Sequence, residues 1–288
     1  MFNDRFIPQL TADGSCTFFS AEFRESFHSH YGARQEAQQK FVVPTQLITL
    51  ARQPKVRLLD ICYGLGYNTA AALEQIWTVN RNCLVEWVGL EYDPTVPQGA
   101  IDHHLLDSWQ PPIPELLAQL ATTHLLQTDR YCAQLSIADA RQTIVSVYNS
   151  GFRADAIFLD PFSPPHCPQL WTVEFLDLVA KCLRPSGLLA TYSCAAAVRK
   201  ALLLVGLKIG SVPPVGRRSP STVASRSDKH LPPLSPQERE HLLTRAAIPY
   251  RDPNLRDSAE VIIQRRHREQ KASTLETTTQ WRKRWLKS

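Results

Sequence analysis

The sequence predicts an α/β fold with a doubly wound, largely parallel sheet, and two observations carry this prediction. Apolar segments of strand length alternate with segments of helical periodicity between residues 56 and 205, a pattern typical of right-handed β-α-β crossovers. Acidic residues also stand at the ends of four strands, at Asp60, Glu91, Asp139 and Asp160. Ligands of such sheets bind at the carboxyl ends of the strands, so we expect these acids to line one cleft.

The expected elements follow in order along the chain. Short apolar runs that stop at an acid or a turn predict strands, whereas apolar residues three or four positions apart predict helices. An Asp between a strand and a helix can also act only as a helix cap, but four such acids in succession favour the shared cleft. Strands are expected at 56–60, 84–91, 133–138, 154–160 and 187–193, and helices at 68–77, 115–126, from 141 onward, 171–183 and 195–205.

Three parts are expected along the chain: residues 1–45 as an N-terminal hairpin and helix covering the cleft, 46–225 as the sheet domain, and 226–288 as a basic helical extension. Prolines, serines and basic residues interrupt the periodicity from Pro213 to Pro236. Ser235 and Glu238 have the spacing of a capping box and predict a short helix. A second helix is expected from 258 to 270.

Composition indicates an ordinary soluble protein, with 43% hydrophobic and 20% charged residues among 288. The N-terminus shows no basic stretch followed by an apolar one, and no apolar run reaches the ~18 residues that cross a bilayer, so we expect a cytoplasmic protein with no membrane partner. The seven cysteines are scattered without a Cys-x-x-Cys pair, and His103-His104 and His166-Cys167 lack a second pair at matching spacing. We therefore expect free thiols and no metal.

The net charge of +5 is unevenly distributed, because residues 217–288 hold 16 Lys/Arg against 8 Asp/Glu while the remainder holds 16 against 19. A basic segment suits a polyanionic partner, although a solvated surface has the same composition. The last stretch, from Trp281 to Lys287, alternates tryptophan with cations. It predicts either an RNA-stacking segment or a tryptophan anchor for the tail.

The segment 56–68, Val-Arg-Leu-Leu-Asp-Ile-Cys-Tyr-Gly-Leu-Gly-Tyr-Asn, indicates a cofactor pocket. Gly64 and Gly66 let the backbone turn sharply and approach a ligand, whereas the acid beside the turn would repel a pyrophosphate. This points to S-adenosylmethionine, a sulfonium, rather than to a dinucleotide. Cys62 stands where a further glycine would complete the motif, and cysteine does not freely take a positive φ. We expect the turn to differ there or to approach the ligand less closely.

The acids of the cleft have distinct expected roles. Asp60 with Gly64 and Gly66 should form the first wall, Glu91 should accept hydrogen bonds from the ribose hydroxyls, and Asp139 from the adenine amine. These groups together suit S-adenosylmethionine.

The segment Asp160-Pro161-Phe162-Ser163-Pro164-Pro165 is the expected reaction side of the cleft. Asp160 can take the proton of an alkylammonium and aim the nitrogen lone pair at a methyl group. Phe162 can stack on a flat base, while the prolines hold the loop in near-attack geometry. A proline-rich turn that only ends a strand is the alternative.

The same residues resemble a known family. Residues 160–164 and 170–172 resemble the Asp-Gly-Phe-(Ala/Ser)-Pro … (Met/Leu)-Trp-Thr segment of the MnmC family, with Pro161 in place of glycine. The methyltransferase domain of that family completes the 5-methylaminomethyl group on the wobble uridine of tRNA. Residues 64–68 look like its Gly-x-Gly-x-Asn turn, and residues 18–20 with Glu36 resemble its N-terminal pattern. The resemblance covers about residues 10 to 225.

The resemblance implies a Rossmann-like class I S-adenosylmethionine-dependent N-methyltransferase, in a stand-alone form without FAD, which converts 5-aminomethyl to 5-methylaminomethyl on U34 of tRNA. Asp160 would face the substrate amine, and we expect a monomer. The cofactor would be held by Asp60, Tyr63, Gly64, Gly66, Asn68, Glu91, Asp139 and Asp160, a flat base by Phe162, and tRNA phosphates by Arg199, Arg217 and Arg218, which can equally be solvated surface. Two alternatives stay open: an aminopropyl or small-amine transferase on the same fold, and a non-catalytic RNA-binding module.

Overall fold

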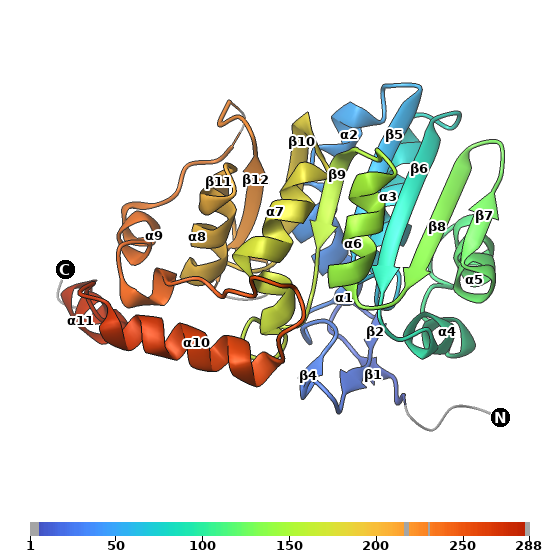
Figure 1. Cartoon of the computed structure of the whole chain (residues 1–288). Helices are drawn as coiled ribbons and strands as arrows, with labels where there is room; N and C mark the ends of the chain where they lie inside the picture. The colour runs from blue at the N-terminus through green and yellow to red at the C-terminus, as the bar shows by residue number, and fades with distance from the viewer. Residues whose placement is uncertain (1–5, 216–218, 230, 286–288) are drawn as a thin grey trace.

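The computed structural model describes residues 6–215, 219–229 and 231–285, and their largest feature is an eight-stranded sheet of order β11-β12-β10-β9-β5-β6-β8-β7 (Figure 1). The five central strands are parallel, while β7 and β12 run antiparallel to their neighbours. The predicted fold class is confirmed. The strands are β5 (Lys55–Ile61), β6 (Leu84–Glu91), β7 (Leu125–Gln127), β8 (Tyr131–Ile137), β9 (Ala154–Leu159), β10 (Leu183–Thr191), β11 (Lys208–Val212) and β12 (Ser221–Ser225).

The order of the strands places a switch point in the middle of the sheet. The chain enters at β5, moves outward through β6 and β8, and returns on the other side of β5 to form β9 and then β10. Consecutive connections therefore diverge between β5 and β9, and a ligand crevice is expected outside the carboxyl ends of these strands.

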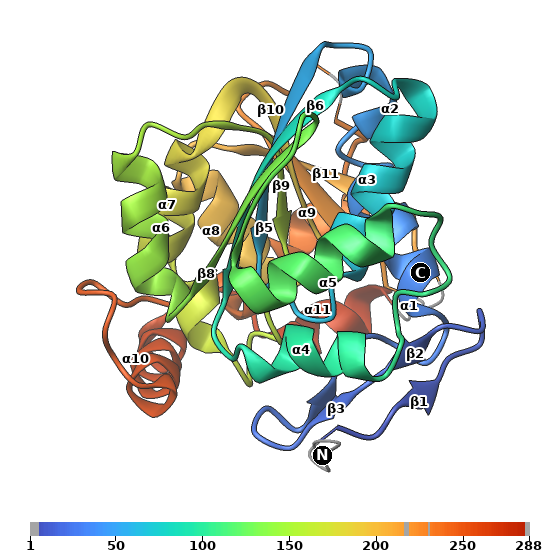
Figure 2. The ribbon, with the colours of Figure 1, turned by 90° about the vertical axis from the view of Figure 1, so that its right-hand side faces the viewer.

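Helices cover both faces of the sheet (Figure 2). Neighbouring residues of a strand point to opposite faces, so Leu58 packs in the apolar cluster on the side of α3, whereas Leu59 packs in the cluster of α6, α7 and α8. One side holds α2 (Leu47–Leu50), α3 (Tyr67–Val79) and α5 (Ile113–Thr123), with α4 (Thr95–Asp102) beneath α5; the other holds α6 (Ala140–Asn149), α7 (Val173–Lys181) and α8 (Ala196–Leu204). A 3-10 turn, η2 (Pro168–Trp171), precedes α7.

The N-terminal segment forms two small hairpins and a helix at the carboxyl edge of the sheet (Figure 1). The ring of Phe18 is fully buried and stacks on Phe6 with centroids 4.9 Å apart, which anchors the hairpins. The elements are β1 (Gln9–Leu10), β2 (Cys16–Thr17), β3 (Phe19–Ser20), β4 (Glu25–Ser26), α1 (Ala33–Glu36) and η1, a π-helical segment (Ala37–Val42).

The C-terminal segment adds α9 (Pro236–His241), η3 (Arg245–Ala247), α10 (Ala259–Ala272) and α11 (Thr278–Trp285). The predicted capping box is present, since Ser235 and Glu238 accept each other's backbone N–H groups. The indole of Trp281 is buried and stacks on His241 at 4.3 Å. Of the two uses predicted for this tail, Trp281 therefore serves as the anchor.

The elements that were not expected from the sequence include α2, α4, α11, β7, β11 and β12. The reason is clearest for β12, whose residues Ser-Thr-Val-Ala-Ser lack an apolar run yet are all buried between β10 and β11. Tertiary packing overrides local propensity there. Among the described residues, no helix is long and apolar enough to cross a membrane.

Candidate active site

A cavity of about 640 Å³ lies at the carboxyl edge of the sheet, a size typical of small-molecule sites. Two regions enclose it, and we name them by their origin. The sheet wall comes from the ends of the parallel strands and from the loops and first helical turns that follow them, and it consists of Cys62, Tyr63, Gly64, Asn68, Glu91, Asp93, Asp139, Arg141, Asp160 and Phe162. The cover wall consists of Phe19, Phe23, Glu25, Phe27, His28, Ser29 and Glu36, from the N-terminal segment.

The glycine turn after β5 adopts left-handed backbone conformations. Gly64 has φ +58° and Gly66 has φ +85°, and a Cβ on Gly66 would lie 2.7 Å from the hydroxyl oxygen of Tyr63. Cys62 takes φ +66°, the conformation of a glycine, at a typical cost of about 1–2 kcal/mol. The reluctance of cysteine to take a positive φ therefore does not prevent this conformation, and a less close approach to the ligand stays a prediction. Strained backbone of this kind persists where the surroundings enforce it, often at functional sites.

Glu91 closes the turn from the neighbouring strand. Its carboxylate accepts hydrogen bonds from the backbone N–H groups of Gly64 at 2.9 Å, Tyr92 at 2.8 Å and Asp93 at 2.9 Å. Burial raises the pKa of Glu91, and the three backbone donors partly counteract it. A carboxylate has about four acceptor positions, so roughly one remains for a ligand hydroxyl.

Asp60 lies behind the sheet wall rather than in it. Its side chain is fully buried, and neither Asp60 nor Gly66 lines the cavity. One carboxylate oxygen accepts the hydroxyl of Thr69 at 2.7 Å, and the other has no partner in the described chain. Burial raises the pKa of Asp60 to about 8. The expectation that Asp60 forms part of the wall is corrected: it turns under the start of α3, where it supports the turn.

Asp160 and Asn68 meet at the centre of the sheet wall. The amide nitrogen of Asn68 donates to Oδ2 of Asp160 at 2.8 Å, and the amide oxygen of Asn68 is buried without a partner in the described chain. Burial raises the pKa of Asp160 well above its usual range, and the bond from Asn68 acts in the opposite direction. Asp160 and Asn68 both line the cavity, and a hydrogen bond joins their side chains.

The loop after Asp160 carries an aromatic group and is held from behind. Trp171 donates its indole N–H to the carbonyl of Phe162 at 2.8 Å, and the hydroxyl of Tyr192 donates to the carbonyl of Pro161 at 2.9 Å. The ring of Phe162 stacks on Phe23 of the cover at 4.5 Å and meets the edge of Phe27 at 5.0 Å. Three phenyl rings from both walls therefore gather beside Asp160.

The cover wall contributes a buried ion pair. Lys40 lies 3.0 Å from Oε1 of Glu36, and their side chains are only 5% and 11% exposed. Burial acts to raise the pKa of Glu36, but Lys40 and the hydroxyl of Ser29 outweigh it, so the net pKa is lowered and Glu36 is ionised. Lys40 stands in the π-helical segment η1, a conformation frequent at functional sites.

Glu25 joins the cover to the loop of Phe162. Its carboxylate accepts from the backbone N–H of Ser163 at 2.8 Å and lies 3.2 Å from Nδ1 of His166. The hairpin is therefore fixed over the cavity by polar contacts as well as by stacked rings.

Another residue of the cover wall, His28, is uncharged. Burial lowers the pKa of His28 to about 4, so its imidazole is neutral near pH 7.

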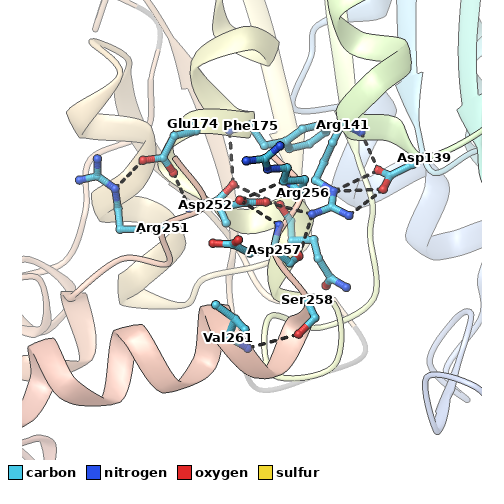
Figure 3. A network of polar contacts seen from close by, with 12 residues as sticks. Asp139, Arg141, Glu174, Phe175, Arg251, Asp252, Arg256, Asp257, Ser258 and Val261 are labelled. Atoms are coloured by element: carbon cyan, nitrogen blue, oxygen red, sulfur yellow. Dashed lines mark hydrogen bonds and ion pairs between the residues drawn. The ribbon is translucent and has the colours of Figure 1, made fainter. Parts of the chain in front are cut away.

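Asp139 caps α6 and reaches the cavity. It accepts the backbone N–H of Arg141 at 2.9 Å, and the guanidinium of Arg141 folds back onto the same carboxylate at 2.7 Å. Arg141 also binds Asp252 at 2.9 Å, so the C-terminal segment meets the sheet wall here (Figure 3).

Arg199, Arg217 and Arg218 were predicted to contact tRNA phosphates, and the structure describes only the first of them. Arg199 is 2% exposed, and its guanidinium binds Glu238 at 2.7 Å and Thr222 at 2.9 Å. Its assignment to tRNA phosphates is wrong, because both charge and surface are already used inside the protein. Arg217 and Arg218 lie outside the described residues. Within the described ranges, no group of three or more His, Cys, Asp or Glu side chains is arranged to hold a metal ion.

Sequence reasoning missed most of the cover wall, namely Phe23, Glu25, Phe27 and His28, and it also missed Arg141. The N-terminal segment predicted a cover in general terms, and the resemblance at Glu36 was a signal for one of its residues. Nothing local marked Phe23, Glu25 and Phe27, because their contacts with the loop of Phe162 join residues more than a hundred positions apart.

Comparison with known proteins agrees with this geometry. A family profile described as S-adenosyl-L-methionine-dependent methyltransferase matches residues 103–227. The crystal structure of MnmC2 from Aquifex aeolicus superposes with a TM-score of 0.82 and 33% identity, covering 93% of this chain and 86% of that one. The fold and site thus define an S-adenosylmethionine-dependent methyltransferase. The chain belongs to the MnmC2 family, as the resemblance predicted.

Two curated relatives extend the comparison. A protein of Methanocaldococcus jannaschii described as uncharacterized is 29% identical over 265 residues, which is 89% of this chain and 70% of that protein. The bifunctional protein MnmC of Cupriavidus necator, named for tRNA 5-methylaminomethyl-2-thiouridine biosynthesis, is 29% identical over 248 residues. The match covers 81% of this chain but 37% of that protein, so the chain spans little more than a third of its bifunctional relative.

The cavity fits the cofactor of this family. The orphaned amide oxygen of Asn68 can accept from an ammonium group, the positive-φ turn at Gly64 brings backbone close, and Glu91 and Asp139 each keep acceptor capacity. Acceptors of this kind suit the ammonium, hydroxyl and amine donors that S-adenosylmethionine carries.

Proposed function

We propose that this protein is an N-methyltransferase that converts the 5-aminomethyl group of wobble uridine in tRNA to 5-methylaminomethyl. Residues 46–225 would form the catalytic domain, 1–45 the cover that completes the substrate pocket, and 226–288 an extension that contacts tRNA. The observation that carries the proposal is one cavity in which a glycine turn, the Asp160–Asn68 pair and three phenyl rings converge.

The sheet wall would hold S-adenosylmethionine, which supplies an electrophilic methyl group when bound. Asn68 and the backbone near Tyr63 and Gly64 would take its amino-acid part, Glu91 a ribose hydroxyl, and Asp139 the adenine amine. Asp60 and Gly66 would act indirectly, by fixing the turn from behind.

Asp160 would prepare the substrate amine. An alkylammonium has a pKa of about 10 and is mostly protonated near neutral pH, so one proton must leave before the lone pair can attack. The raised pKa of Asp160 brings its proton affinity nearer to that of the amine. Asp160 would take that proton at Oδ1, while Asn68 holds Oδ2 in place.

The cover wall would recognise the substrate as a cationic group on a flat base. Ionised Glu36 attracts an ammonium, and phenyl faces attract cations and stack on bases. Phe162, Phe23 and Phe27 supply those faces next to Asp160. Such a pocket favours an amine attached to an aromatic ring over a purely aliphatic polyamine.

The C-terminal extension would meet the phosphates of tRNA. Arg268 and Lys271 on α10 and Arg282 and Lys283 on α11 are exposed. The segment that leads into α10 touches the rim of the cavity through Arg141 (Figure 3). A basic surface on the extension suits a polyanion whose modified base enters the cavity.

The test is radiolabelled methyl transfer to tRNA from cells that lack this protein. We expect label in 5-methylaminomethyluridine after nucleoside analysis, and none with the same tRNA lacking the 5-aminomethyl group. Putrescine and spermidine serve as competing acceptors. Label in a polyamine, or no label in aminomethylated tRNA, would reject the proposed substrate.

A further inference from the structure

One buried carboxylate of the C-terminal extension, that of Asp252, reaches the sheet wall (Figure 3). Asp252 has no exposed surface, and its Oδ2 accepts from Nη1 of Arg141 at 2.9 Å. Its Oδ1 accepts from the backbone N–H groups of Arg256 at 3.1 Å and Asp257 at 3.2 Å. One oxygen thus closes the loop of the extension, and the other holds a side chain that lines the cavity.

Arg141 connects two carboxylates from distant parts of the chain. Its Nη2 and Nε donate to Oδ2 of Asp139 at 2.7 and 3.1 Å, while Nη1 donates to Asp252 and to the carbonyl of Asp257, both at 2.9 Å. The side chains of Arg141 and Asp139 are 13% and 28% exposed. Charge-assisted bonds with little water access are strong and directional, so the guanidinium fixes the orientation of both acids.

We propose that Asp252 is a positioning residue of the cofactor site: it holds Arg141, which orients the carboxylate of Asp139 toward the adenine end of the cavity. This inference rests on the role proposed above for Asp139. Without Asp252, Nη1 of Arg141 keeps only the carbonyl of Asp257, and the partly exposed Asp139 gains rotational freedom. The extension is then a structural part of cofactor recognition as well as a contact for tRNA.

The test measures binding of S-adenosylhomocysteine and S-inosylhomocysteine by calorimetry to the full chain and to Asp252→Asn. Inosine lacks the exocyclic amine from which Asp139 would accept a hydrogen bond. The amide oxygen of Asn can still accept from Arg256 and Asp257, so the loop is kept while the charge facing Arg141 is lost. We expect the affinity for S-adenosylhomocysteine to fall roughly tenfold, as for a lost charge-assisted bond, and that for S-inosylhomocysteine to stay within about twofold.

Arg251→Ala is the matched control, because Arg251 is the exposed neighbour of Asp252 on the same loop. Its guanidinium pairs with Glu174 of α7 at 2.7 Å rather than with Arg141 or Asp139. The variant should keep the preference for S-adenosylhomocysteine. If thermal denaturation shows that Asp252→Asn does not fold, Arg141→Lys replaces it. A lysine cannot bridge both acids, so this variant should also lose the preference for S-adenosylhomocysteine over S-inosylhomocysteine.

An equal loss of affinity for both ligands in Asp252→Asn would indicate a merely structural effect and overturn the inference. The inference would also be overturned if Asp252→Asn kept the wild-type preference for S-adenosylhomocysteine over S-inosylhomocysteine, or if the wild type showed no such preference. Binding requires no tRNA, so a failure of the proposed tRNA substrate leaves this result readable.

Discussion

The two walls of the cavity use different physical means. The sheet wall presents backbone N–H groups and carboxylates held by backbone donors, as Glu91 shows, and its geometry follows from strand ends that meet at one edge. The cover wall presents phenyl rings and the ionised carboxylate of Glu36, which is paired with Lys40, and contacts between distant segments hold this wall in place. The difference suggests that the sheet wall binds the methyl donor, which is common to many enzymes, and the cover wall selects the acceptor.

The largest expected effect comes from Asp160, where the two walls meet. Asp160→Asn keeps the shape and removes the proton acceptor, so methyl transfer should fall about 10²–10⁴-fold while S-adenosylmethionine binding stays within a few-fold. Single-turnover kinetics with calorimetry check this. Because the pKa of Asp160 is raised, the wild-type rate should increase with pH as the carboxyl loses its proton. Unchanged turnover in Asp160→Asn would remove this residue from the mechanism.

The buried ion pair of the cover should matter for stability. Lys40→Met leaves Glu36 as an uncompensated buried charge, and the free energy of unfolding should fall by about 3 kcal/mol. Lys181→Met is the matched control, because Lys181 and Asp177 form the same i,i+4 pair with side chains 47% and 43% exposed. It should cost less than about 0.5 kcal/mol. Urea denaturation of both variants measures the difference, and equal losses would contradict it.

A pair of variants separates donor binding from acceptor selection. Glu91→Ala should raise the Kd for S-adenosylmethionine about 10- to 100-fold, because the ribose acceptor and the brace of the Gly64 turn are both lost. Glu36→Gln should leave that Kd within about twofold and raise the KM for tRNA instead. Calorimetry and steady-state kinetics on the two proteins decide. If both variants weaken binding of the same ligand, the proposed division of roles between the two walls is wrong.

Asp60 should make the stability of the fold depend on pH. Its folded-state pKa of about 8 exceeds the unfolded value of 3.8, so the native state binds the extra proton between these values. The contribution is fully present below about pH 4 and is lost as pH rises toward 8, by up to about 1.4 kcal/mol per pH unit. Asp60→Asn removes this dependence. The free energy of unfolding of the variant should therefore increase relative to that of the wild type as pH increases from 5 to 8. Parallel stability curves would refute the assignment.

Local pattern was sufficient for the five parallel strands of the sheet and for part of the site. Strand β6 has the predicted bounds, and the Ser235 capping box is present, because hydrophobic alternation and end capping are properties of neighbouring residues. The acids at the strand ends were found for the same reason. Arg199 was misassigned because a basic residue after a strand has the same sequence signature whether solvated or paired in the interior.

The sequence by itself determined the five parallel strands with the helices between them, the glycine turn, the acids at the sheet edge and the family to which the chain belongs. Only the tertiary structure decided which acids face the cavity: Asp60 turns beneath α3, whereas Glu91, Asp139 and Asp160 line the cavity. It also brought Asp252 to Arg141 across 111 positions of sequence. The physical reason is that periodicity records how a residue meets its neighbours along the chain, whereas burial and charge pairing depend on segments that become neighbours only after folding.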